Sequence, residues 1–320
     1  MNLTRTRYAF FAVVAIVAVA VVGSTTPAMA GTWKTKAPMP TPMLNAHAGA
    51  INGILYVAGG QNASGASSML QAFDPVANVW STLAPMPDIR SGGEAGVINS
   101  QLYVAGGWNA YLPTNTLYMY DPPSNTWTTL AYLSHLSACG GGGVINGKLY
   151  VTTACNGYSG YVNYLDVYDP VANAWTSLPG SSAGHGNGAV GVINSKLYVA
   201  GGYTGNGTLG GTFEVYDPAT NAWTTLKPMP TPVAGAASAV IDGKLNVFGG
   251  YNGTSMITTV QVYDPFTKKW TKQTPTFPTV AQEAGACDML YGIAFLVGGY
   301  DINGNVLGTN DQYYVSPTIP

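Results

Sequence analysis

Short runs of alternating apolar and polar residues, separated by tight turns, follow one another along most of the chain. A representative unit starts with GAVGVI, turns at Asn194-Ser195 into KLYVAGG, continues as TFEVY to Asp217-Pro218, and ends with AWTTL. This alternation is typical of β-strands, and Asn-Gly and Asp-Pro pairs are typical of the turns between them. Each unit is therefore predicted to be a four-stranded antiparallel meander.

The unit recurs with a constant period. Six of the seven tryptophans, at positions 33, 80, 127, 175, 223 and 270, are separated by 47, 47, 48, 48 and 47 residues. A fixed period of this length indicates a repeat architecture, and a radial arrangement lets the aromatic residues of each sheet pack against the next sheet. The predicted fold class is all-β, a six-bladed β-propeller of four-stranded antiparallel blades.

The two ends of the repeat array are expected to close the ring. The segment GTWKTKAPMP at the start of the array is a tryptophan strand with no strands before it, and the last repeat ends without such a strand. Residues 31–37 are therefore predicted to form the outer strand of the last blade, within a single domain at 31–320. The six repeats are predicted at approximately residues 44–84, 91–131, 138–179, 186–227, 234–274 and 283–317.

Residues 1–30 have the pattern of a signal peptide. Two arginines precede an apolar run at residues 8–22, and Ala-Met-Ala ends at Ala30. The apolar run is shorter than the roughly 20 residues that span a bilayer. We expect cleavage after Ala30 and a mature protein that is secreted, periplasmic or at the cell surface, with no membrane span after signal removal. Retention of the segment as an anchor is the alternative.

Charge is scarce in this chain. Only 8% of residues are charged, the formal net charge is −2, and the longest basic run is Lys268-Lys269. Nucleic acid is excluded as an expected partner, because affinity for phosphate backbones depends on clustered Lys and Arg. The ligand is expected to be a carbohydrate or a protein, bound by a monomer.

The repeat resembles the kelch repeat, in which a double glycine is followed by Tyr or Phe before Asp-Pro and then by Trp. Tyr120-Asp121-Pro122 with Trp127 is a clear copy, and the resemblance covers nearly all of the mature chain. The third repeat differs, because it has Thr153-Ala154 in place of the double glycine. No Trp-Asp dipeptide occurs, which argues against WD repeats.

In a four-stranded blade, the loop after the second strand and the loop between blades emerge on the same face. Sequence variation between repeats is concentrated on that face, whose candidate ligand-binding residues are Arg90, Trp108, His185, Tyr203, Tyr251, Tyr300, Glu94 and His47. Trp and Tyr offer flat apolar rings with a polar tip, which suit the C–H faces and hydroxyls of sugars. The alternative is that these rings only shield the blades.

Arg90 matches a position from which an arginine of kelch domains often reaches the central pocket; the alternative is a solvated or carbonyl-bonded side chain. The three histidines, His47, His135 and His185, belong to different blades and have no metal-ligand spacing. We therefore expect no metal and no other cofactor. His47 and Glu94 occupy equivalent positions in neighbouring blades, and they are interpreted as a candidate acid/base couple or a structural hydrogen bond.

The cysteines are expected to form one disulfide. The hairpin turn at Asn146-Gly147 pairs residues whose numbers sum to 293 or 294, which brings Cys139 opposite Cys155. An oxidising compartment then favours a bond between them. Cys287 is expected to stay reduced and buried.

The leading hypothesis is an exported propeller that binds a carbohydrate or a protein. The kelch resemblance implies one enzymatic alternative of suitable size and export, a metal-free sugar-active enzyme like periplasmic sialic-acid mutarotase, which would use Arg90, Glu94, His47 or His185. A galactose-oxidase-like copper enzyme is less well supported, because no set of two His, two Tyr and a Tyr-linked Cys is recognisable. A scaffold without a small ligand is a further alternative. A tight pocket with a contacting carboxylate and histidine would favour catalysis, whereas a broad aromatic rim would favour binding.

Overall fold

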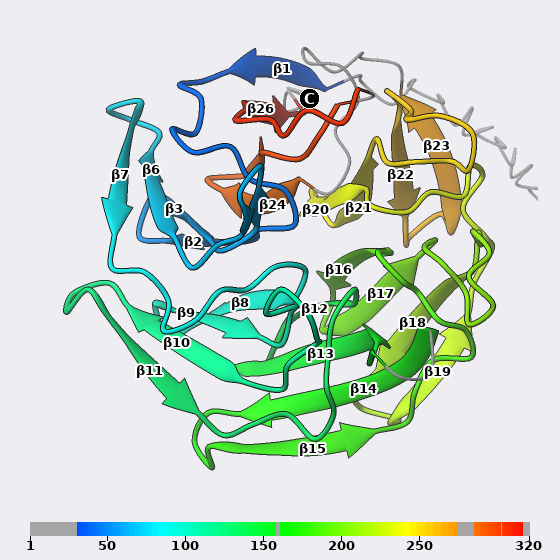
Figure 1. The fold of residues 1–320 in the computed structure, drawn as a ribbon. Helices are drawn as coiled ribbons and strands as arrows, with labels where there is room; N and C mark the ends of the chain where they lie inside the picture. Colours follow the sequence, from blue (N-terminus) through cyan, green and yellow to red (C-terminus); the bar gives the residue numbers. More distant parts are fainter. Residues whose placement is uncertain (1–30, 158–160, 274–284, 302, 316–320) are drawn as a thin grey trace, which may run out of the picture.

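The computed structural model describes residues 31–157, 161–273, 285–301 and 303–315, which form a ring of four-stranded sheets (Figure 1). Six such sheets surround a central axis, and the described ranges contain no helix. The predicted all-β class and the six-bladed propeller are confirmed. No helix among these residues is long and apolar enough to cross a membrane. The predicted signal segment at 1–30 lies outside the described residues.

The two inner strands of each blade are uniform in length except in the third blade. The innermost strands are β2 (His47–Ile51), β8 (Glu94–Ile98), β12 (Gly141–Ile145), β16 (Ala189–Ile193), β20 (Ala237–Ile241) and β24 (Ala286–Leu290). The second strands are β3 (Ile54–Ala58), β9 (Gln101–Ala105), β13 (Lys148–Cys155), β17 (Lys196–Ala200), β21 (Lys244–Phe248) and β25 (Ile293–Val297).

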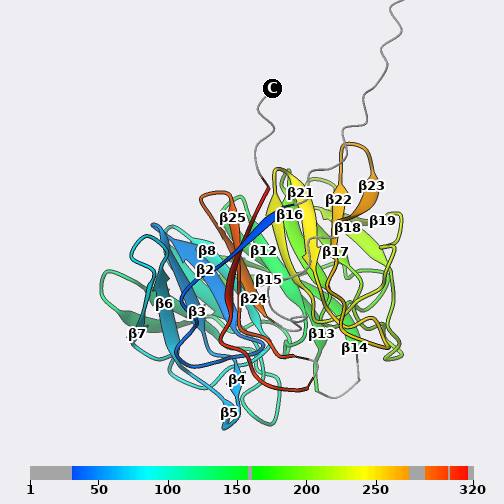
Figure 2. The same ribbon diagram turned by 90° about the horizontal axis from the view of Figure 1, so that it is seen from above.

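The two outer strands of each blade follow the same order. The third strands are β6 (Leu70–Asp74), β10 (Leu117–Asp121), β14 (Tyr161–Asp169), β18 (Phe213–Asp217), β22 (Val260–Asp264) and β26 (Asn310–Tyr314). The outer strands are β7 (Val79–Leu83), β11 (Thr126–Leu130), β15 (Ala174–Leu178), β19 (Ala222–Thr225), β23 (Lys269–Gln273) and β1 (Thr32–Thr35). A short hairpin of β4 (Gln61–Asn62) and β5 (Gly65–Ala66) projects from the first blade (Figure 2).

The recurrent phrase YDPxxNxW is explained by its hydrogen bonds. In the second blade the Tyr120 hydroxyl donates to Asn125 Oδ1 at 2.8 Å, which fixes the turn between the two outer strands. Asn125 itself has a φ of 53°, a conformation that Asn tolerates better than most residues. The indole N–H of Trp127 donates to the carbonyl of Ala84 at 2.8 Å. The indoles of Trp80, Trp175, Trp223 and Trp270 make equivalent bonds, so in the first five blades the outer strand holds the loop that leads into its own blade.

The predicted register and the predicted closure are both confirmed. Across the turn at Asn146 and Gly147, Gly141 pairs with Thr152, so paired residue numbers sum to 293. At the ring closure β1 pairs with β26, and Trp33 lies opposite Tyr313 (Figure 1). The Trp33 ring also packs against Phe248 of the fifth blade, with ring centroids 5.8 Å apart. The N-terminal strand therefore completes the last blade.

The two faces of the disc are built differently, and we name them by their connections. The loop face carries the loops that follow the second strands and the crossing loops that lead from one blade to the next. It faces the viewer in Figure 1 and lies at the bottom of Figure 2. The turn face carries the tight turns between the first and second strands and between the third and outer strands. Bridges such as Ser91 to Trp108 and Ala234 to Tyr251 join the two kinds of loop on the loop face.

Candidate functional site

Each described crossing loop is tied to a side chain that lies three residues before the end of a third strand. The equivalent residues in the six blades, all buried, are Gln71, Tyr118, Asp166, Glu214, Gln261 and Asp311. Gln261 illustrates the plain form of this anchor, because its amide accepts from the N–H of Thr231 and donates to the carbonyl of the same residue, both at 2.9 Å. In the second, third and fourth blades, where this third-strand residue is not Gln, a different group of the crossing loop contacts it.

Arg90 is such a partner, and it lies inside the protein with only 1% of its surface exposed. Its guanidinium donates to Thr116 Oγ1 at 2.7 Å and to the Tyr118 hydroxyl at 3.1 Å. It also pairs with Asp88 at 2.9 Å and donates to the carbonyl of Ile89. The prediction that Arg90 reaches the central pocket is therefore corrected: this arginine holds a crossing loop against the second blade.

His185 is also withdrawn from the surface. Its Nδ1 lies 2.9 Å from the carbonyl oxygen of Gly201, and its Nε2 lies 2.9 Å from Glu214 Oε2. Burial alone would raise the pKa of Glu214, but hydrogen bonds from His185 and Ser182 outweigh it and lower that pKa. Both ring nitrogens of His185 are occupied and the pair is closed to solvent, so the predicted ligand contact of His185 is corrected as well.

His47 and Glu94 occupy equivalent positions, as predicted, but they do not form a couple. His47 Nε2 is buried without a hydrogen-bond partner, and burial together with the charge of Arg90 lowers the pKa of His47 to about 4. Burial raises the pKa of Glu94 to about 8. Glu94 lies in the next blade interface, where its side chain approaches Gly142. Neither residue has the other as a partner, so the acid/base couple is not assembled.

The third histidine, His135, forms a separate contact. Its Nδ1 lies 3.1 Å from Asp166 Oδ2, and its ring stacks on Tyr164 with centroids 4.1 Å apart. Ser177 donates to the other oxygen of Asp166 at 2.6 Å. The three histidines thus belong to different interfaces. Within the described ranges, no three His, Cys, Asp or Glu side chains gather in a geometry that could hold a metal ion.

The predicted aromatic residues do lie on the loop face. Four half-buried rings stand directly after the double glycines of their blades: Trp108, Tyr203, Tyr251 and Tyr300. A fifth ring, Tyr161 at the start of β14, was missed by sequence reasoning. It stacks on Tyr203, with centroids 5.7 Å apart and an interplanar angle of 24°. The sequence contained one signal for Tyr161: it is an extra aromatic residue at the point where the third repeat departs from the pattern of the others.

A partial ring of backbone hydrogen bonds, described for five of the blades, follows the mouth of the central channel on the loop face. It joins five equivalent residues that have φ values between 51° and 69°: Asn45, Gly92, Cys139, Asn187 and Gly235. The N–H of each of the last four donates to the carbonyl of the one before it, at 2.7–2.9 Å. This ring lines a hollow of about 120 Å³ whose described residues are all uncharged. The blades are thereby linked directly at the mouth.

Cys155 lies opposite Ala138, and not opposite Cys139 as predicted, and all three described cysteines are free thiols in the structure. The Cys139 thiol hydrogen-bonds with Cys155, and this contact, with a second one from Trp108, lowers the pKa of Cys139. A left-handed backbone is uncommon for cysteine, whereas the equivalent residues are Asn or Gly. The disulfide itself stays a prediction. Cys287 is only partly buried, in the channel wall.

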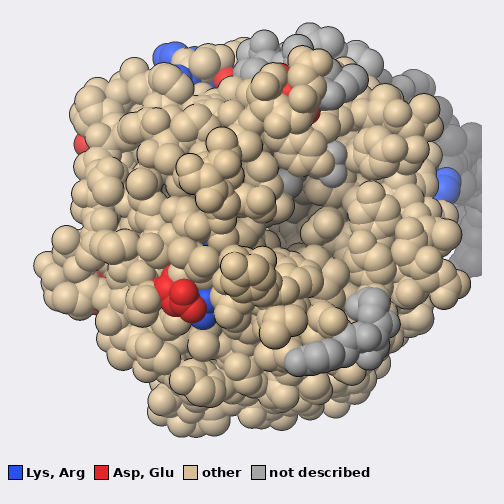
Figure 3. All heavy atoms as spheres, in the orientation of Figure 1, with Lys and Arg blue, Asp and Glu red and all other residues tan. Residues whose placement is uncertain are grey.

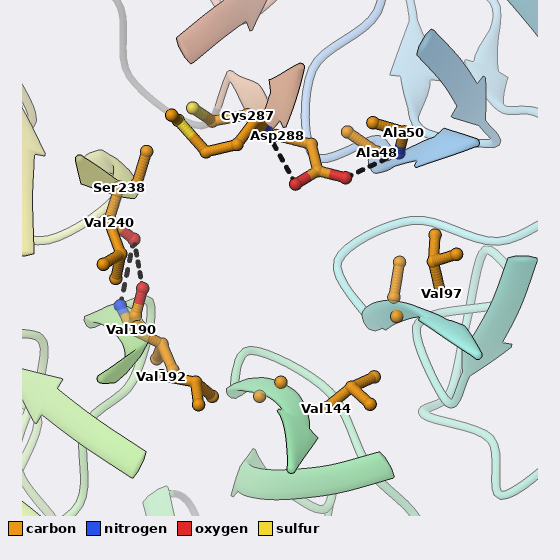
Figure 4. Close-up of a pocket in the computed structure, with 17 residues that line it drawn as sticks. Ala48, Ala50, Val97, Val144, Val190, Val192, Ser238, Val240, Cys287 and Asp288 are labelled. Atoms are coloured by element: carbon orange, nitrogen blue, oxygen red, sulfur yellow. Dashed lines mark hydrogen bonds between the residues drawn. The ribbon is translucent and has the colours of Figure 1, made fainter. Parts of the chain in front are cut away.

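The channel behind the mouth has a volume of about 410 Å³ and is lined by the innermost strands (Figure 4). Its wall consists mainly of Gly, Ala and Val, with the backbone edges of the strands exposed between them. Asp288 is the acidic residue in this lining, at a position where the other blades have Gly or Ala. Its Oδ2 accepts from the N–H of Ala50 at 2.6 Å, and Ser238 caps Val190 in a similar way.

Charged atoms are sparse on the loop face. Figure 3, which looks onto this face, shows a hollow at the centre and only a few coloured atoms around it. The open surface therefore consists mainly of uncharged groups.

These blades, with their double glycines and Tyr-Asp-Pro turns, define a kelch-type β-propeller with an open loop face that carries few charges. The chain matches the family model described as Attractin/LZTR1 beta-propeller over residues 55–309, and it belongs to that family. A solved structure described as "Structure of YjhT" is similar over 88% of this chain and 97% of that chain, with a TM-score of 0.76 and 20% identity. At this identity the similarity shows the shared fold alone. No curated protein matches the chain.

Proposed function

We propose that the protein is a binding module whose loop face takes up a neutral carbohydrate. The observation that carries the proposal is the composition of that face: the half-buried rings of Trp108, Tyr203 and Tyr251 are each followed by Asn or Thr, and the described residues that line the mouth are uncharged. Aromatic rings pack on the apolar C–H faces of sugars, and amides and hydroxyls supply both donors and acceptors for sugar hydroxyls. Charged ligands would find few partners here.

The enzymatic alternative, a metal-free sugar-active enzyme, needs an acid and a base that reach the substrate. Among the described residues, two carboxylate–histidine contacts, Glu214 with His185 and Asp166 with His135, tie loops to strands; the His135 side chain is 34% exposed, but its carboxylate partner Asp166 is fully buried. Both members of the Glu214 pair are nearly inaccessible, with side chains 1% and 4% exposed. An aromatic rim without an open acid/base couple favours binding over catalysis.

Export of this binding module follows from the predicted signal segment and forms part of the proposal. A neutral polymer outside the cytoplasm, such as a surface or extracellular polysaccharide, is the chemical class that fits an exported module with so little charge. A protein ligand for the same face is the competing outcome.

The test is a glycan screen of the mature chain, residues 31–320, followed by titration at about 50 mM and about 500 mM salt. We expect binding to neutral glycans with the same affinity at both salt concentrations, because screening acts on charge pairs. Binding only to sialylated or sulfated glycans, with a steep loss at high salt, would contradict a neutral ligand. Capture of a protein with no glycan bound would overturn the carbohydrate class.

A further inference from the structure

One crossing loop differs from the others at a position that is otherwise filled. The position lies in the crossing loop, nine residues after the tryptophan of the preceding outer strand. In four crossing loops it is a half-buried apolar residue: Pro42, Ile89, Leu136 and Pro232. The loop between the third and fourth blades has Gly184 at this position, within the run GSSAGHG. Small residues therefore replace bulky ones in this loop.

The contacts of the prolines show what the missing side chain would occupy. A Cβ atom added to Gly211 would lie 3.2 Å from Pro232 Cγ. A Cβ atom added to Gly308 would lie 3.4 Å from Pro42 Cγ. In those blades the ring fills the gap between the crossing loop and the segment that enters the third strand. At Gly184 the apolar side chain is absent, and an added Cβ would be in tight contact with the loop after the second strand of the fourth blade, 3.2 Å from the backbone nitrogen of Gly205.

The open gap is a groove of about 370 Å³ on the loop face, away from the central channel. Three segments line it, namely the start of β14, the crossing loop and the loop after the second strand of the fourth blade; their residues are Tyr161, Val162, Asn163, Ser182, Ala183, Gly184, Thr204, Gly205 and Asn206. None of these side chains is charged. The volume is in the range of small-molecule sites, which are about 300–1,000 Å³.

The walls of the groove are held in place from below. Both oxygens of the buried Glu214 accept backbone N–H groups of the crossing loop, from Ser182 at 3.1 Å and from Ala183 at 3.3 Å. On the facing wall, Thr204 Oγ1 lies 2.8 Å from Thr208 Oγ1. The Tyr161 ring is supported by its stack on Tyr203. A groove fixed in this way can bind a ligand without first becoming ordered.

We propose that this groove between the third and fourth blades binds one pyranose ring of the neutral glycan. This proposal rests on the proposed function and adds its location. The Tyr161 ring supplies the apolar surface for the C–H face of the sugar, and the polar groups of Ser182 and Asn206 supply partners for its hydroxyls. The ring of hydrogen bonds at the channel mouth then serves to link the blades, and the groove holds the sugar.

The test measures the binding of neutral methyl gluco-, galacto- and mannopyranosides to the mature chain by saturation-transfer NMR and calorimetry. Gly184→Ile places in the groove the side chain that Ile89 has in the second blade, and Asn206→Ala removes an exposed polar partner. We expect at least about a tenfold loss of affinity for Gly184→Ile and a threefold to tenfold loss for Asn206→Ala. The matched control is Pro232→Gly, which opens the equivalent gap in the next crossing loop and should leave affinity unchanged.

The outcomes separate the two proposals. If the wild type binds a glycoside and both Gly184→Ile and Asn206→Ala keep full affinity, the groove is not the site, while carbohydrate binding stands. If the wild type binds neither a glycoside nor a longer neutral glycan, the proposed function fails and the groove proposal fails with it. Should circular dichroism show that Gly184→Ile does not fold, the Asn206→Ala result decides.

Discussion

The two faces of the disc are built from different kinds of connection, and their sequences differ greatly. On the turn face the same solutions recur: Asn or Asp begins the inner hairpin turn in the first five blades, and Lys196 and Lys244 pair with Asp217 and Asp264 in matching salt bridges. On the loop face equivalent positions hold Arg, His, Ser, Val and Met. Residues that are the same in every blade have a purely structural role. Residues that vary between blades are not always functional, because Arg90 and His185 vary and are nevertheless structural.

The largest expected effect follows from that exception. Arg90→Ala removes a buried cation and leaves its partners in the second blade unsatisfied, so we expect the free energy of unfolding to fall by about 3–5 kcal/mol. Urea unfolding of the mature chain measures it, and Lys34→Ala on the exposed outer strand β1 is the control. A decrease below about 1 kcal/mol would show that Arg90 is solvated and would return it to the candidate ligand contacts.

The cysteine pair on the loop face gives the next effect. If Cys139 and Cys155 are joined in the exported protein, reduction should lower the free energy of unfolding by about 3 kcal/mol in the chain-entropy model. Thiol titration of protein recovered from an oxidising compartment should then find a single free cysteine, Cys287. Cys287→Ser is the matched control and should not alter the response to reductant. Three reactive thiols, or a crosslink through Cys287, would contradict the pairing.

Glu94 provides a pH-dependent test of the buried polar layer. Its pKa is about 8 in the fold and near 4.5 when exposed, so the folded state holds an extra proton between these values and loses stability as pH rises from about 4.5 to 8. Glu94→Gln stays neutral and should remove this slope. Because the side chain retains some exposure, we expect the variant to be more stable than wild type by about 2 kcal/mol at pH 8.5.

The comparison for Glu94 is made by urea unfolding across the pH range. The two proteins should have equal stability at about pH 4, where both side chains are neutral. Parallel pH profiles for wild type and Glu94→Gln would mean that Glu94 is solvated and ionised at neutral pH.

The smallest effects belong to the turn face. Lys196→Ala removes one exposed salt bridge, and Lys244→Ala removes its counterpart in the fifth blade. Exposed pairs contribute little to stability, so the melting temperature should barely change, and glycan affinity should be unaltered. A loss of glycan affinity in either variant, measured by calorimetry, would show that the turn face is the binding surface.

Much of the fold could be predicted because it depends on local patterns repeated six times. The tryptophan period, the Asn146-Gly147 turn and the unpaired strand at Trp33 together predict blade number, register and closure. These features are determined by residues close together in sequence, or by a period long enough to be unmistakable.

The candidate site was harder to predict, because its residues are positioned by partners in the third strands of the blades that their crossing loops lead into. Arg90 resembles a solvent-exposed loop residue until Tyr118, 28 positions away, is identified as its partner. His185 is likewise determined by Glu214. Aligning the repeats column by column would have revealed both exchanges, together with the replacement of proline by Gly184. In both exchanges, two residues that contact one another both differ from the repeat consensus. A single position examined alone does not show this.

The central claim is that a neutral carbohydrate binds on the loop face. Hydrogen–deuterium exchange of the mature chain, with and without a saturating neutral glycan from the screen, tests it most directly. The account predicts protection in the loop-face segments 108–114, 182–188 and 203–210, and no change in the turns at 52–53, 194–195 and 242–243. Protection confined to those turns, or none in any segment at saturation, would contradict it.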